Sequence, residues 1–111
     1  MANPTEFAVR GTIKLDPAWP VEAIALALMD CAHDAETQHD FAVSMDLARA
    51  EVEIECIVAG RDSADALANA SIEIHTVCAY ADLPIKFVDG AKPSPSIWHV
   101  EPSEPTVLAL A

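Results

Sequence analysis

Apolar and polar residues alternate near the start of the chain. From Phe7 to Leu15 every second position is apolar or glycine, and Arg10 and Lys14 lie between them. A period of two with one apolar side predicts a strand with one buried face. After Pro20 the apolar residues recur every three or four positions, which predicts a helix. Pro20 suits its first turn, where the missing N–H costs nothing.

Two more alternating stretches, Phe41–Leu47 and Val52–Val58, follow this helix. The apolar positions are odd-numbered in the first and even-numbered in the second. A continuous strand keeps its parity, whereas a turn can change it. We therefore predict an antiparallel hairpin with Leu47 opposite Val52. The junction lacks an Asn-Gly or Asp-Gly pair, and its residues favour helices, so a helix from Met45 to Val52 is the competing interpretation.

The second half of the chain begins with the clearest amphipathic pattern, from Ser63 to Ala81. Asp62 or Ser63 can accept hydrogen bonds from the first N–H groups of this helix. A proline at position 84 ends it, and a short strand is predicted at Ile85–Val88. The prolines that follow enclose Ile97–Val100, which either adds an edge strand or lies on the surface.

The element order is strand, helix, strand, strand, helix, strand. This order predicts an α+β sandwich of the ferredoxin-like type, with a four-stranded antiparallel sheet and both helices on one face. The expected spatial order of the strands is 4-1-3-2. Residues 1–90 would form this single domain, and residues 91–111 a proline-rich C-terminal extension.

The first and third strands would then be neighbours with complementary charges. Arg10 and Lys14 face outward on the first strand, and Glu51, Glu53 and Glu55 face outward on the third. We call these three glutamates the carboxylate row. Opposite charges on paired strands stabilise the sheet by roughly 0.2–1 kcal/mol per pair.

Charge and cysteine content limit the partners and the compartment. The formal net charge of −12 repels phosphate backbones and anionic membrane surfaces. The sequence shows neither a secretory leader nor an apolar run long enough for a membrane span. Three widely spaced cysteines without a CxxC pair predict reduced thiols. We therefore expect a cytoplasmic protein that binds neither nucleic acid nor membrane.

Three groups of residues are candidates for catalysis or metal binding. His75 and Cys78 lie three positions apart on the predicted helix, but a nucleophile pair of this kind lacks a third partner. The carboxylate row could act in acid–base catalysis if burial separated its pKa values. A cluster of possible metal ligands has no recognised zinc spacing, so we predict no metal site there: Cys31, His33, Asp34, Glu36, His39 and Asp40.

No nucleotide-binding or hydrolase motif is present in the sequence. We predict a non-catalytic domain that binds a small ligand or a protein and uses no cofactor. It would self-associate through its sheet or bind a basic protein. The alternative is a small enzyme that uses His75, His99 or the carboxylate row. The predicted ligand or partner surface is Arg10, Lys14, Glu51, Glu53, Glu55, Trp98 and His99.

Overall fold

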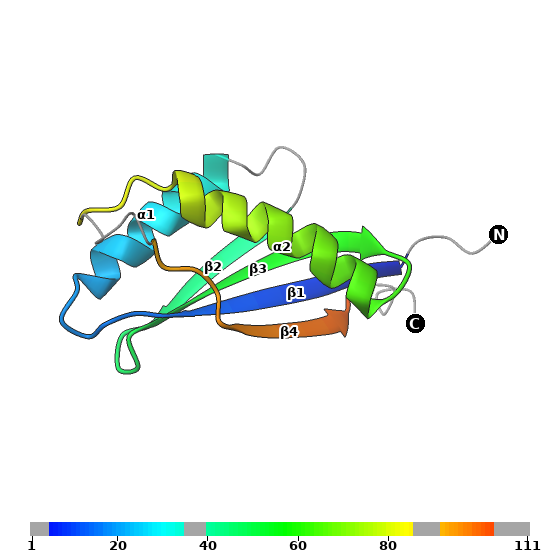
Figure 1. The fold of residues 1–111 in the computed structure, drawn as a ribbon, viewed down its shortest axis with the longest axis horizontal. Helices are drawn as coiled ribbons and strands as arrows, with labels where there is room; N and C mark the ends of the chain where they lie inside the picture. The colour runs from blue at the N-terminus through cyan, green and yellow to red at the C-terminus, as the bar shows by residue number, and fades with distance from the viewer. Residues whose placement is uncertain (1–4, 35–39, 86–91, 104–111) are drawn as a thin grey trace, which may run out of the picture.

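The computed structural model describes residues 5–34, 40–85 and 92–103. The elements in these ranges are β1 (Thr5–Lys14), α1 (Val21–Asp34), β2 (Asp40–Asp46), β3 (Glu51–Gly60), α2 (Ser63–Tyr80) and β4 (Ile97–Pro102). The four strands form one antiparallel sheet in the order β2-β3-β1-β4. Both helices lie on the same face of this sheet (Figure 1). The α+β class predicted from the sequence is confirmed.

The centre of the sheet is the pairing of β1 with β3. Every residue of β1 has a partner on β3, from Thr5 opposite Gly60 to Lys14 opposite Glu51. This register places Arg10 opposite Glu55, so the predicted charge complementarity between these strands is present. Because side chains alternate along a strand, the same register turns the apolar positions of both strands toward the helices.

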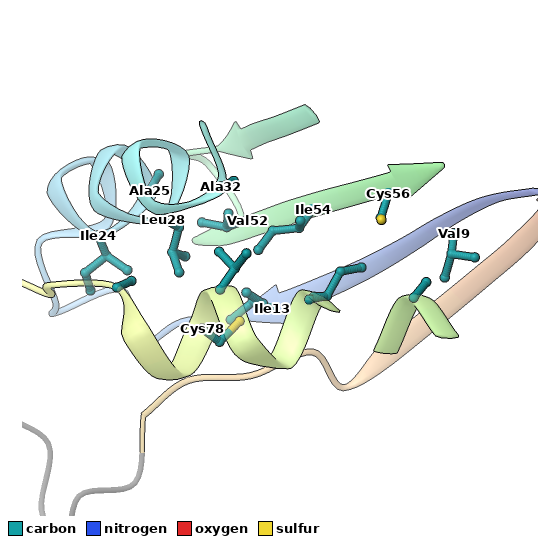
Figure 2. Close-up of a cluster of buried hydrophobic side chains, with 14 of the residues drawn as sticks. Val9, Ile13, Ile24, Ala25, Leu28, Ala32, Val52, Ile54, Cys56 and Cys78 are labelled. Atoms are coloured by element: carbon teal, nitrogen blue, oxygen red, sulfur yellow. The ribbon is translucent and has the colours of Figure 1, made fainter. Parts of the chain in front are cut away.

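The core lies between the helices and the sheet. Figure 2 shows side chains from α1, α2, β1 and β3 pointing into this layer. Ile24 and Leu28 from α1 meet Ile13 from β1 and Ile54 from β3, and all four are completely buried. Burying a side chain of this size stabilises the fold by about 1.5–3 kcal/mol. This layer therefore explains why the alternating and helical patterns occur in one chain.

The α2 helix begins and ends as its sequence predicts. The Asp62 side chain accepts a hydrogen bond of 2.8 Å from the backbone N–H of Asp65, which satisfies one of the free donors of the first turn. After Tyr80 the backbone becomes extended. The Lys92 ammonium donates to the carbonyl oxygens of Ala79, at 2.7 Å, and Ala81, at 3.2 Å. A cation at this end also complements the helix dipole.

The hairpin between β2 and β3 differs from the prediction in register. Met45, not Leu47, is opposite Val52, and residues 47–50 form a four-residue turn. Hydrogen bonds of 3.3 Å link Arg49 to Asp46 and Ala50 to Leu47 across this turn. A longer turn does not need the Asn-Gly or Asp-Gly pair of a two-residue loop. The backbone does reverse here, so the competing helix from Met45 to Val52 is wrong.

The fourth strand of the sheet differs from the predicted one in position. Ile85 lies in a bend, and residues 86–88 of the expected strand are outside the described residues. The strand beside β1 is β4, whose residue Val100 pairs with Val9. Of the two interpretations of Ile97–Val100, the edge strand is confirmed. The sheet therefore includes residues that the division at residue 90 assigns to a C-terminal extension.

Gly11 allows the segment before β4 to pass close to β1. A Cβ atom at this position would lie 2.8 Å from Pro95 Cγ, 2.9 Å from Pro95 Cβ and 3.1 Å from Trp98 Cζ3. The proline ring is rigid, so this space cannot open without moving the backbone. The glycine on the apolar side of β1 is thus explained by a close crossing.

We expect Gly11→Ala to lower the free energy of unfolding by about 1–3 kcal/mol, because the added methyl group overpacks this crossing. Urea denaturation measures the change. In a Pro95→Gly background the cost of Gly11→Ala should shrink, since both of the nearest atoms are gone. Equal costs in the two backgrounds would refute the steric explanation.

Candidate functional site

The face of the sheet opposite the helices has no covering element within the described residues, and we call it the open face. The strand registers assign its side chains, because alternate residues of each strand point to the same side. Carboxylates outnumber cations on it. The acidic residues are Glu6, Asp40, Asp46, Glu51, Glu53, Glu55 and Glu101, and the basic residues on its strands are Arg10 and Lys14.

Arg10 lies at the centre of a charged network across β3, β1 and β4. Its Nη2 atom donates to Glu101 Oε1 at 2.9 Å, and its Nε atom is 3.9 Å from Glu55 Oε2. The His99 Nε2 atom is 3.5 Å from the other oxygen of Glu101. The Arg10 side chain is 30% exposed, so each pair contributes at most about 1 kcal/mol. Its charge is matched within the chain, which leaves little of it for a ligand anion.

A hollow of about 250 Å³ lies at the hairpin end of the open face. Glu53 is opposite Thr12 on one side and Ser44 on the other, so no base lies across from it in either neighbouring strand. Asp46 is 3.7 Å from Arg49 Nε in the turn. We call this the acidic hollow, and its lining residues are Thr12, Ser44, Met45, Asp46, Arg49, Glu51 and Glu53.

A second hollow of about 490 Å³ lies toward the other end of the same face. Its apolar lining comes from Ala8, Ile57 and Pro102, and its carboxylates are Glu55 and Glu101. Both carboxylates also belong to the Arg10 network. The open face thus has two depressions, one lined by polar residues apart from Met45 and one with apolar patches.

The structure places six of the seven predicted surface residues on the open face and the seventh on the opposite one. Trp98 and His99 are neighbours on β4 and therefore point to opposite sides of the sheet. The Trp98 ring is half-buried against the core, and its centroid lies 5.7 Å from that of the His75 ring. Trp98 packs within its own chain, and His99 is on the open face with the charged residues.

The geometry of His75 and Cys78, which the sequence places three positions apart, does not favour a nucleophile pair. His75 Nδ1 is 2.7 Å from the carbonyl oxygen of Ser71, so this nitrogen carries the proton and donates. Cys78 is buried, and burial raises the pKa of its thiol to about 11. A thiol that stays protonated at neutral pH is a poor nucleophile. The arrangement instead fits a core cysteine beside a surface histidine.

The three cysteines are free. Cys56 and Cys78 are buried, whereas Cys31 is half-buried. Among the candidate metal ligands of the sequence, Glu36 and His39 lie outside the described residues. Within the ranges that the structure describes, no group of three or more His, Cys, Asp or Glu side chains is placed to hold a metal ion.

Sequence reasoning did not single out three contributors to the open face. Asp46 continues the alternation of β2, so parity identifies its side. Glu101 follows His99 by two positions and would have been found if the last strand had been assigned to β4. Arg49 belongs to the acidic hollow because of the turn geometry, and the sequence pattern gave no signal for it.

Comparison with protein-family models, with curated proteins and with solved structures finds no match for this chain. None of the helices in the described part of the chain is both long and apolar enough to span a membrane. The interpretation of the site therefore depends on the geometry and charge of the chain's own residues.

The buried thiols predict a pH dependence of stability. Burial raises the pKa of Cys56 from 9.0 to about 12, so the folded state holds this proton more tightly than the unfolded state. The stability that this thiol proton contributes to the folded state is fully present below pH 9 and is lost as the pH rises toward 12. We expect the free energy of unfolding to fall as the pH rises over this range. Cys56→Ala should make this fall with pH less steep.

Val58→Ala is the matched control, because it truncates another buried apolar side chain of β3 without removing a titrating group. Urea denaturation from about pH 8 to pH 10.5 measures both slopes. If Cys56→Ala and Val58→Ala keep the same slope as the wild-type chain, the Cys56 thiol is not responsible.

Proposed function

We propose that this chain is a non-catalytic protein-interaction domain of the ferredoxin-like type that binds a basic protein through its open face. The observation that carries the proposal is the excess of carboxylates on a sheet face that neither helix covers. The negative charge of this face would attract a positively charged partner and hold it there. Free cysteines suit a reducing compartment, and the proposal places the domain in the cytoplasm.

The acidic hollow is better suited to bind one side chain of a partner protein than a small-molecule ligand. Pockets for drug-sized ligands usually measure about 300–1,000 Å³, and this hollow has about 250 Å³. Its size and its carboxylates suit one lysine or arginine side chain. Glu53 is the best placed to accept it, because the residues across from it on both strands are uncharged.

The same charges argue against self-association through the open face. Two copies meeting there would bring the carboxylate row of one near that of the other, and Arg10 is already paired with Glu55 and Glu101. Like charges across an interface cost several kcal/mol. Of the two partners that the sequence leaves open, the basic protein therefore fits this face better.

The alternative of a small enzyme has less support from the geometry. His75 is a residue of α2 and packs on Trp98 on the helical side of the sheet, whereas His99 and the carboxylate row lie on the open face. The candidate acid–base groups are thus divided between two sides of the sheet. General acid–base catalysis needs such groups within hydrogen-bond reach of one substrate.

A peptide of eight arginines is the probe for the proposed surface. We expect Glu51→Gln combined with Glu53→Gln to weaken its binding by about 3- to 30-fold, the loss of two ion pairs of about 0.3–1 kcal/mol each. Fluorescence anisotropy at low and physiological ionic strength measures the affinity, which should fall as salt rises.

The matched control is Glu22→Gln combined with Asp30→Asn, two exposed carboxylates of α1. It changes the net charge by the same amount at a site on the helical side. If both double variants weaken peptide binding equally, the attraction comes from net charge and the open face is not the site.

A further inference from the structure

The outer face of α2 has no charged residue over four helical turns. Between Asp65 and the end of the helix its exposed residues are Ala68, Asn69, Ile72, His75, Thr76, Ala79 and Tyr80. Glu73 is half-buried on the flank. We call these seven exposed residues the neutral face. In a chain with a net charge of −12, an uncharged helix surface of this length requires an explanation.

The neutral face also exposes large apolar side chains. Ile72 is 65% exposed and Tyr80 is 80% exposed. Ala68, Ile72, His75 and Ala79 follow one another at steps of four, three and four residues. These steps form the seam that a second helix packs against in a coiled coil, and the alanines allow close approach at both ends of it.

We propose that the neutral face is a homodimer interface, in which α2 of one copy packs against α2 of a second copy. The net charge of the chain indicates why a second copy would bind at this face. Two copies that each carry −12 repel one another, so they can meet with the smallest electrostatic cost where neither has a charged side chain. The face is equivalent in both copies, as a two-fold interface requires.

The ends of the helix favour an antiparallel pair. The acidic Asp65 lies in the first turn of α2, and the Lys92 ammonium binds the carbonyls at its last turn. Asp65 is held within its own chain by Arg61, whose backbone N–H donates to its Oδ2 at 2.9 Å, so the favourable term in an antiparallel arrangement is the opposition of the two helix dipoles. Ile72 then lies near the centre of the seam, close to the two-fold axis.

The interface is small, which sets the expected affinity. A helix of 18 residues is about 27 Å long, and one helix face buries less than the roughly 800 Å² per partner of a standard interface. We therefore expect a weak dimer with a dissociation constant in the micromolar range. Salt should strengthen it by screening the repulsion between the two copies, the reverse of its effect on basic-peptide binding.

Sedimentation equilibrium of the full chain at about 10–500 µM, with low and high salt, tests the proposal. We expect the wild-type chain to dimerise more tightly in high salt. Ile72→Glu should weaken the dimer by about tenfold or more, since it buries a charge on each side of the axis. Ile97→Glu is the matched control, because Ile97 is 48% exposed on the opposite side of the sheet.

Mixing the Ile72→Glu chain with an Ile72→Lys chain tests the two-fold geometry. Each variant alone should dimerise about tenfold or more weakly than the wild-type chain, and the mixture should associate more tightly than either variant alone through the opposite charges at the axis. Circular dichroism confirms that each variant is folded, and Ala79→Glu serves as a second variant on the same face.

A wild-type chain that stays monomeric in high salt overturns the proposal. So does equal dimerisation of the Ile72→Glu and Ile97→Glu chains. Failure of the mixture to associate overturns the two-fold arrangement. Because peptide binding is measured on the other side of the sheet, each of these results is independent of the proposed partner surface.

Discussion

The antiparallel pairing of β1 with β3 is the constraint on which the rest of this structure depends. It joins ten residues of each strand in one register. Side-chain alternation then determines which side of the sheet each of these residues faces. Ile13 and Ile54 are completely buried beneath the helices, while Arg10 and Glu55 meet on the other side. A shift of one residue in either strand would exchange these two environments. The hydrophobic core and the acidic face are thus two consequences of the same pairing.

The sequence pattern predicted the parts of the fold in which one side of an element is clearly apolar. The β1 strand alternates cleanly, and α2 combines a helical period with the cap at Asp62. The pattern was less informative where local chemistry is ambiguous. A turn without glycine left the hairpin register open, and Met45 rather than Leu47 is opposite Val52. The strand that pairs with β1 on its free side is β4, which the pattern gave only as one of two interpretations of Ile97–Val100 because prolines surround it.

The candidate site was predictable to the extent that it lies on well-assigned strands. Alternation, together with the element order that makes the first and third strands neighbours, placed the carboxylate row opposite Arg10 and Lys14. Trp98 was grouped with His99 because they are adjacent in sequence, yet adjacency on a strand separates two side chains. Trp98 instead fills the space beside Gly11 and His75. Depressions such as the acidic hollow depend on the turn at residues 47–50, and no one-dimensional pattern specifies their shape.

The distribution of charge relates the two proposed surfaces to each other. The acidic residues of β2, β3 and β4 lie on the open face, and α2 presents its neutral face on the helical side of the sheet. Because these surfaces are on opposite sides, occupation of one leaves the other accessible. A dimer through α2 would direct two acidic faces outward and away from each other, which reduces the repulsion between them. Such a dimer could bind two basic segments of one partner, and the second binding event would then be intramolecular. Weak pairing through α2 and weak ion pairs on the sheet would together give a stronger complex than either interaction alone.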